Sequence, residues 1–445
     1  MKRYILFTLL FALITASQAN GHFFRLVYKP KIDFHGYLNR TCIPHRGGVA
    51  YLNISINTPA LETRNRKPMN LSVVLDRSGS MADARKIDYA KSAISHLIDN
   101  LTGEDYFSLV MYDDQIDILV SPQQVRDKRR LKNIVNEIYP NGSTNLGGGM
   151  IEGFRQAEHF VTKECVNRVI LLSDGLANQG ITDQNELNRI ASRYRSKSIS
   201  LSTMGVGLDY NENLMLGLAE HGGGNYYYIE SPNQLSTIFE RELKGLSAIV
   251  AQNASVELEL GRGVTVNDVI GCKWNRARET WVIPLGDLYG NEHRELTVEL
   301  NIPEGTGTKR VATGTLKYES RKMEVRNFPS FSVEIRYSDD VAELDKSTNL
   351  DVQGKIEVAL STRKVEQAME AYDAGDEDEA AMRIEEARSM IQSSKAITNS
   401  AASPMMQEQL QSLETYSKEL KDESKDKRAR KKSIQYKNYQ IQKKK

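Results

Sequence analysis

The chain has 445 residues and a nearly balanced charge, with 59 lysines and arginines against 58 aspartates and glutamates. This balance argues against a protein that binds nucleic acid or another polyanion over its whole surface. The length is sufficient for two or three domains.

Residues 1–19 are typical of a signal peptide. Two basic residues precede an apolar run at 4–16, and the small residues at 17–19 fit a cleavage site before Asn20. The run is too short to span a bilayer comfortably, and no later segment has enough consecutive apolar residues to do so. We therefore expect an exported protein, located in the periplasm or at the cell surface.

Residues 20–67 contain strand-like pieces, of which 49–56 alternates apolar and polar residues in its second half. Short strands with glycine and proline turns return at 249–338, a spacing typical of an antiparallel β-sandwich. We expect both segments to form one sandwich, into which the region between them is inserted.

Residues 68–248 alternate strand and helix patterns, which predicts a doubly wound, mostly parallel sheet covered on both faces. The first strand is 71–75, and the helix after it has an apolar face at helical spacing. Another apolar strand is predicted at 168–172. In open sheets of this class, binding sites form at the carboxyl ends of strands.

Three polar segments lie at such positions. Asp76-Arg77-Ser78-Gly79-Ser80 follows the first strand, Thr144 precedes three glycines at 147–149, and Ser173-Asp174-Gly175 follows the strand at 168–172. Their carboxylates and hydroxyls are the oxygen ligands that hard divalent cations prefer. Each segment taken alone is also a common turn or helix cap. The presence of all three, in this order, favours a metal site.

This set resembles the metal-ion-dependent adhesion site of von Willebrand factor type A (VWA) domains. The resemblance covers roughly residues 68–245 and implies a Rossmann-like fold. It also implies five ligand residues, which are Asp76, Ser78, Ser80, Thr144 and Asp174. The ion is expected to be Mg2+, with Mn2+ or Ca2+ as alternatives, because all three accept oxygen ligands.

The C-terminal third changes to helix. Residues 339–396 are expected to form a helical hairpin that packs on the sandwich. Residues 397–445 are polar and, from 418 onward, rich in lysine and arginine. Two interpretations of this tail stay open: a disordered solubilising tail, and a peripheral contact with an anionic envelope surface.

The cysteines and the glycosylation sequons bear on the compartment. Cys42, Cys165 and Cys272 fit no zinc motif, and a disulfide between Cys42 and Cys272 is a hypothesis whose alternative is free thiols. Sequons at Asn70 and Asn141 lie where a glycan would disturb a strand or crowd the metal site. We therefore favour a bacterial exported protein.

Two functions remain. The first is an exported, cation-dependent binding module of the adhesion type, whose metal recognises an aspartate or glutamate of a partner protein. The second is an envelope scaffold in which the metal only holds three loops together. No catalytic motif accompanies the site, and the seven histidines have no metal-ligand spacing, so we do not expect an enzyme.

Overall fold

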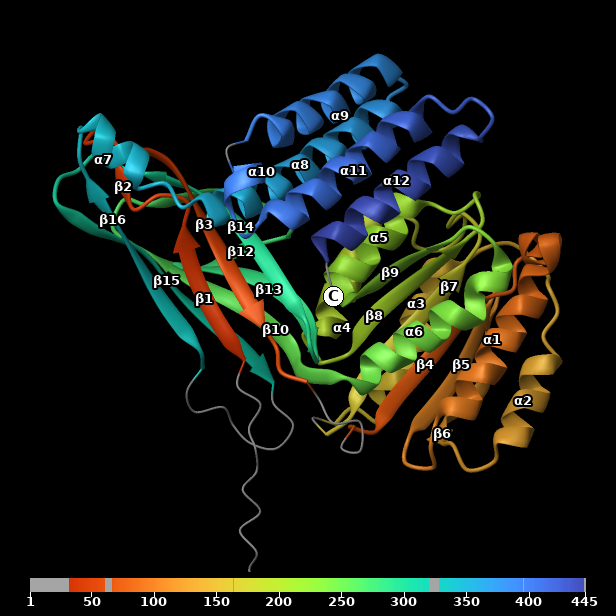
Figure 1. The fold of residues 1–445 in the computed structure, drawn as a ribbon. Helices are drawn as coiled ribbons and strands as arrows, with labels where there is room; N and C mark the ends of the chain where they lie inside the picture. Colours follow the sequence, from red (N-terminus) through yellow and green to blue (C-terminus); the bar gives the residue numbers. More distant parts are fainter. Residues whose placement is uncertain (1–31, 61–65, 163, 320–327, 395, 444–445) are drawn as a thin grey trace, which may run out of the picture.

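The computed structural model describes residues 32–60, 66–162, 164–319, 328–394 and 396–443. The predicted signal peptide lies outside these residues. Three parts are visible in Figure 1: a β-sandwich, an α/β domain beside it, and a layer of helices that lies along both. Within the described ranges, no helix is both long and apolar enough to cross a membrane.

The α/β domain has one six-stranded sheet with the strand order β6-β5-β4-β7-β8-β9. Only β6 runs antiparallel to its neighbour. The strands are β4 (Met69–Asp76), β5 (Tyr106–Tyr112), β6 (Ile116–Gln124), β7 (Val166–Ser173), β8 (Ser200–Val206) and β9 (Gly223–Ile229). The mostly parallel sheet predicted from the alternating pattern is therefore confirmed.

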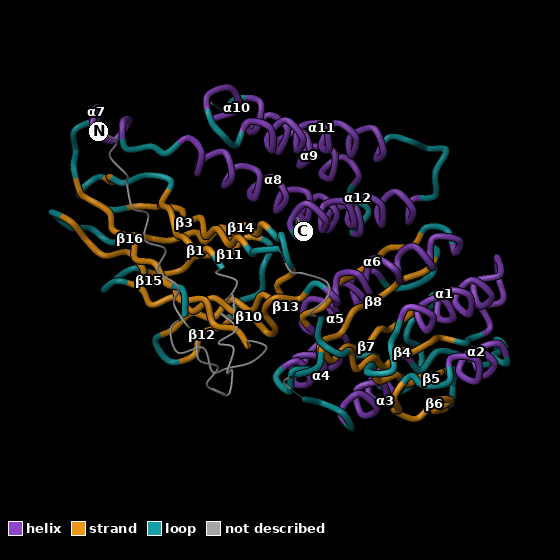
Figure 2. Tube along the Cα trace, turned by 60° about the horizontal axis from the view of Figure 1, so that its bottom comes forward, coloured by secondary structure: helices purple, strands orange, loops and turns teal. Residues whose placement is uncertain are grey.

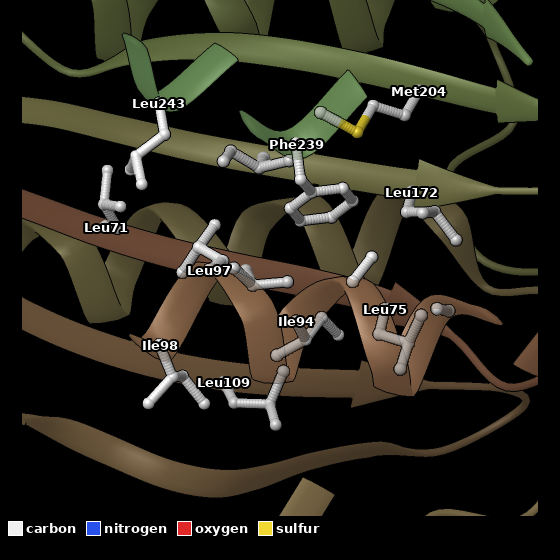
Figure 3. Close-up of a cluster of buried hydrophobic side chains, with 14 of the residues drawn as sticks. Leu71, Leu75, Ile94, Leu97, Ile98, Leu109, Leu172, Met204, Phe239 and Leu243 are labelled. Carbon is white, nitrogen blue, oxygen red and sulfur yellow. The ribbon is translucent and has the colours of Figure 1, made fainter. Parts of the chain in front are cut away.

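Helices cover both faces of this sheet. One face carries α1 (Lys86–Asn100), α2 (Lys128–Asn136) and α6 (Leu235–Ser247), and the other carries α3 (Leu146–Glu158), α4 (Gln184–Arg195) and α5 (Glu212–Gly222). Every residue of β4 and β7 is buried, as expected for strands between two helical layers. Figure 3 shows Ile94 and Leu97 of α1 facing Phe239 of α6 over the sheet.

The sandwich combines strands from both sides of the α/β domain in sequence. One sheet has the order β1 (Asp33–Leu38), β3 (Gly48–Asn57), β14 (His293–Ile302), β11 (Thr265–Ile270). The other has the order β12 (Asn275–Ala277), β13 (Thr280–Tyr289), β10 (Ile249–Leu260), β15 (Thr308–Glu319), β16 (Ser330–Tyr337), β2 (Cys42–Ile43). Because β3 pairs with β14 along its whole length, the α/β domain is an insertion in the sandwich.

The turn between β13 and β14 holds both connections to the inserted domain. Its Gly290 N–H donates to the Ala248 carbonyl, at 2.7 Å, where the chain returns to the sandwich. Its Asn291 N–H donates to the Pro59 carbonyl, at 3.2 Å, where the chain leaves it. We call this turn, residues 290–292, the clasp. It fixes the two ends of the insertion side by side.

The C-terminal region has more ordered helix than the sequence suggests. It contains α7 (Val341–Lys346), α8 (Leu350–Asp373), α9 (Glu377–Gln392), α10 (Ala396–Asn399), α11 (Ser403–Leu420) and α12 (Lys427–Gln442). The helices α8 to α12 pack together, as seen from a second direction in Figure 2. α8 also packs on the sandwich, where Lys355 pairs with Glu295 at 2.5 Å.

The prediction of a disordered basic tail is wrong. Several of its basic residues are paired within the molecule: Lys431 and Lys432 both contact Glu212 at the start of α5, and Lys432 is 1% exposed. Tyr436 and Tyr439 pack against Tyr226 of β9 instead of facing an envelope surface. The sequence pattern shows the charge of α12 but not the acidic partner that neutralises it.

The hypothesis of a disulfide is also wrong for this structure. Cys42, Cys165 and Cys272 are all free thiols. Cys42 and Cys165 are buried, so they behave as small apolar side chains of the core.

Candidate metal centre

The five predicted ligand residues lie on three loops at one edge of the α/β sheet. Asp76 is the last residue of β4, and Asp174 directly follows the neighbouring strand β7. Thr144 lies just before α3, whose first turn is capped by the Asn145 side chain accepting from the Gly148 N–H at 3.0 Å. β4 is the first strand of this sheet in the sequence, and later strands are added on both sides of it. Binding sites in this class of fold usually form where the strand order reverses in this way.

Hydrogen bonds connect the hydroxyls of the first loop to the carboxylate of the third. Ser78 and Ser80 have their Oγ atoms 3.2 Å apart, and the Ser80 hydroxyl donates to Asp174 Oδ1 at 2.8 Å. Four of the five residues are at most 4% exposed, namely Asp76, Ser78, Thr144 and Asp174. The arrangement therefore places carboxylate and hydroxyl oxygens together in a sheltered position.

Thr144 reaches the same place from the second loop. A methyl group added at Gly175 would lie 3.3 Å from Thr144 Oγ1 and 3.8 Å from Ser80 Oγ. The Thr144 N–H is fixed by donating to Asn178 Oδ1 at 3.0 Å. The absence of a side chain at Gly175 therefore lets the second and third loops approach, and all five predicted residues come together.

Asp76 is held from several sides. Its Oδ1 accepts from the Ser78 N–H at 2.9 Å, and its Oδ2 accepts from the Ser173 hydroxyl at 2.7 Å and the Tyr112 hydroxyl at 3.2 Å. Burial raises the pKa of Asp76 to about 6, and the nearby charge of Asp174 adds to the rise. The hydrogen bonds from Ser78 and Ser173 oppose it. Without a cation, ionisation of this carboxyl is costly.

The three glycines in the first turn of α3 act through packing. A side chain at Gly149 would meet the Tyr112 ring at 2.5 Å, so the glycine lets α3 approach the strand that carries Tyr112. Tyr112 in turn reaches Asp76. The glycines at 147–149 therefore serve the close packing of α3 against its neighbours.

Asp113 and Asp114 follow β5 at the same edge, in the turn that leads to β6. Asp113 is 1% exposed and pairs with Arg77 Nε at 2.8 Å. Arg77 also accepts from the Asn141 N–H through its carbonyl, at 2.6 Å. Asp113 therefore holds the first two loops in position, whereas Asp114 is exposed.

Sequence reasoning missed Lys86, Tyr112 and Ser173. Ser173 lies within the recognised Ser-Asp-Gly segment, and Tyr112 ends a predicted strand. Both residues could therefore have been proposed from the sequence as neighbours of the site. Lys86 carried no signal, because its approach to Asp174 depends on the backbone before α1. The α-helix begins only at Lys86, since Ala84 and Arg85 have left-handed φ angles of 49° and 59°.

The donor set fits a hard divalent cation. Two carboxylates and three hydroxyls offer oxygen only, and Mg2+ completes its octahedron with water or a ligand oxygen. Within the described ranges, no group of three or more histidine, cysteine, aspartate or glutamate residues is placed to hold a metal. A cation at this edge would therefore depend on the hydroxyls as well as on the two carboxylates.

Residues 70–241 form a von Willebrand factor type A domain, because they match the model of that family. Among curated proteins, the chain is similar to the uncharacterised protein YfbK of Escherichia coli, with 28% identity over 52% of this chain and 42% of that protein. It is 30% identical to protein sll0103 of Synechocystis over 47% and 49% of the two chains. Human inter-alpha-trypsin inhibitor heavy chain H3 is 25% identical over 43% and 23%. The chain spans at most about half the length of these relatives.

Two solved structures share the fold over almost the whole chain. A von Willebrand factor type A protein from Catenulispora acidiphila superposes with a TM-score of 0.74 at 17% identity, covering 93% of this chain and 97% of its own. The ArnB paralog VWA2 from Sulfolobus acidocaldarius gives a TM-score of 0.61 at 18% identity, covering 92% and 99%. The likeness extends beyond the VWA domain and therefore includes the sandwich and the helices.

Proposed function

We propose that this protein is an exported protein-binding module that captures a partner carboxylate through a divalent cation at the edge of its VWA domain. The observation that carries the proposal is the convergence of Asp76, Ser78, Ser80, Thr144 and Asp174 from three loops. VWA domains are often metal-dependent adhesion or protein-interaction modules, which supports the same conclusion.

The residues have separate roles in this proposal. Asp76 and Asp174 supply the negative charge that attracts the cation, and the three hydroxyls add oxygen ligands without further charge. Tyr112 and Ser173 orient Asp76 by donating to its Oδ2. The bound cation, Mg2+ with Mn2+ or Ca2+ as alternatives, supplies an open coordination position for an oxygen of the partner.

We propose binding and not catalysis. The three loops bring together carboxylates held by hydrogen bonds and hydroxyls that contact one another, and no cysteine or histidine appears among the residues described above as forming the site. Export rests on the sequence of residues 1–19 alone. The scaffold function, with a purely structural cation, is the second candidate, favoured by the hydrogen bonds that already tie the first loop to the third.

The first test measures the cation itself. Chelator-treated protein is titrated with Mn2+ and Mg2+ by calorimetry, and we expect one site in the wild type and no uptake by Asp174→Ala. Asp114→Ala is the matched control, because it removes an exposed carboxylate at the same edge and should bind the cation normally. Absence of uptake by the wild type would refute the proposal.

The second test separates binding module from scaffold. Immobilised protein is incubated with an envelope extract in Mg2+ or in EDTA, and the captured proteins are identified by mass spectrometry. A binding module loses its partner both in EDTA and in Asp174→Ala, and retains it in Asp114→Ala. If the protein binds the cation but captures the same partners in EDTA and as Asp174→Ala, the scaffold function is supported and the binding module is refuted.

A further inference from the structure

The metal centre contains a lysine that the ligand motif does not include. Lys86, the first residue of α1, is 7% exposed, and its Nζ lies 2.7 Å from Asp174 Oδ2. The same Nζ lies 3.5 Å from the Ser80 carbonyl, so it contacts both the first and the third loop.

The backbone before α1 positions this lysine, and a left-handed glycine lies next to its side chain. The left-handed φ angles of Ala84 and Arg85 delay the start of α1 and place Lys86 at its first position. On the opposite side, Gly207 after β8 has a φ of 75°, and a Cβ there would be in ordinary van der Waals contact with Lys86 Cε, at 3.5 Å. Left-handed conformations are unfavourable for non-glycine residues and persist where the surrounding structure requires them.

The lysine compensates only one of the two carboxylates. Asp174 has an ion pair with Lys86, whereas the contacts of Asp76 are hydrogen bonds from Ser78, Ser173 and Tyr112. With both carboxylates ionised and Lys86 charged, the site has a formal charge of −1. A divalent cation changes it to +1, and the same cation without Lys86 gives zero.

We propose that Lys86 is a resident counter-charge of the metal centre, which weakens cation binding and leaves the loaded site positive, so that it selects an anionic group. This inference rests on the proposed function and assigns to Lys86 the regulation of that site. Lys86 stabilises the metal-free protein by neutralising buried Asp174. Once a cation is bound, the same lysine repels it and adds to the attraction for a carboxylate.

The test compares Lys86→Met with the wild type by Mn2+ titration of chelator-treated protein and by thermal unfolding. We expect the variant to bind Mn2+ at least tenfold more tightly, because a like charge is removed from beside the cation. We expect a lower Tm without metal, because Asp174 is left unpaired, and recovery of most of that loss in saturating Mn2+. A purely structural lysine would lower Tm in both conditions and would not tighten Mn2+ binding.

Lys91→Met is the matched control. Lys91 lies on the same helix, but its Nζ donates to the Ile138 carbonyl at 3.1 Å and contacts the Tyr139 ring. It should leave the Mn2+ affinity unchanged. If Lys86→Met does not fold, Lys86→Gln keeps a hydrogen-bond donor and removes the charge, and the same increase in affinity is expected. Equal or weaker Mn2+ binding by a folded Lys86 variant overturns the inference, whereas absence of Mn2+ uptake by the wild type overturns the proposed function.

Discussion

Strand β7 has a buried charged cluster near each of its ends, and the two clusters differ in how positive charge is supplied. Near the amino end, Arg168 is completely buried and pairs with Asp287 of the sandwich at 2.8 Å. It also forms an ion pair with Glu242 of α6, at 3.7 Å, and donates to the Ser202 hydroxyl at 2.9 Å. At the carboxyl end, Lys86 pairs with Asp174, whereas Asp76 is held by hydrogen bonds from uncharged groups.

The pKa values of the carboxyl groups express this difference. Burial opposes ionisation of Glu242, but the charge of Arg168 and hydrogen bonds from Ser202, Asn225 and Tyr227 outweigh it, so the pKa of Glu242 is lowered. The pKa of Asp76 is raised to about 6, chiefly by burial. At the amino end, the permanent charge of Arg168 holds the two domains together. At the carboxyl end, one lysine does not neutralise both carboxylates, and this favours binding of an exchangeable cation.

Removal of Arg168 should cause the largest loss of stability. Arg168→Met leaves Asp287 and Glu242 buried without their cation, and loss of one partner of a buried pair costs about 3–5 kcal/mol. We expect a fall of this size in the free energy of unfolding, measured with urea, or a failure to fold. Arg189→Met, on the exposed face of α4, should change it by less than about 0.5 kcal/mol. Similar effects for the two variants would mean that the buried pair is not a joint.

In the metal-free protein, Asp76→Asn should raise the free energy of unfolding, whereas Arg168→Met lowers it. Because the pKa of Asp76 in the folded protein lies above its ordinary value of 3.8, its favourable contribution is complete below about pH 4 and is lost as pH rises through about 6. At pH 7.5 the variant should therefore be more stable than the metal-free wild type, by about 1–3 kcal/mol. Denaturation in EDTA at pH 7.5 and pH 4 measures both values. The gain should disappear at the lower pH.

The ion pairs that dock α12 should have a smaller, local effect. Glu212→Gln removes the carboxylate shared by Lys431 and Lys432, and hydrogen bonds to charged groups contribute about 1.5–3 kcal/mol. We expect faster amide hydrogen exchange in residues 427–442 than in the wild type. Glu377→Gln, whose partner Lys427 is half exposed, is the control and should leave exchange in the rest of α12 unchanged. Protection of α12 that survives Glu212→Gln would show that its apolar contacts suffice.

Exposed pairs should matter least. Lys132 and Asp99 lie 2.8 Å apart on the surface, with side chains 35% and 50% exposed. Lys132→Ala should reduce the free energy of unfolding by less than about 0.5 kcal/mol, and the reduction should vanish in 1 M salt. A larger effect would remove the distinction between buried and exposed pairs on which the comparison depends.

The sequence sufficed for the features that follow local patterns. Fully apolar strands and amphipathic helices predicted the α/β sheet, and the positions of Asp76 and Asp174 after predicted strands, with Thr144 in the motif between them, predicted the edge at which they meet. The structure brings together all five residues that the motif indicated.

The features that sequence reasoning missed depend on distant partners. The charge of α12 suggested a solvated tail, because Glu212, which neutralises it, lies more than 200 residues earlier in the chain. Lys86 belongs to no motif and was not singled out in the sequence. Its position depends on two left-handed residues before α1, which a helical pattern does not reveal.

The clasp has a mechanical consequence. Because Pro59 and Ala248 are both bonded to residues of one turn, the chain leaves and re-enters the sandwich at neighbouring points. A tensile force along the polypeptide can then pass from β3 to β14 through their shared ladder, bypassing the inserted domain. A force that pulls β3 and β14 apart would therefore load their shared ladder and not the strands of the inserted sheet.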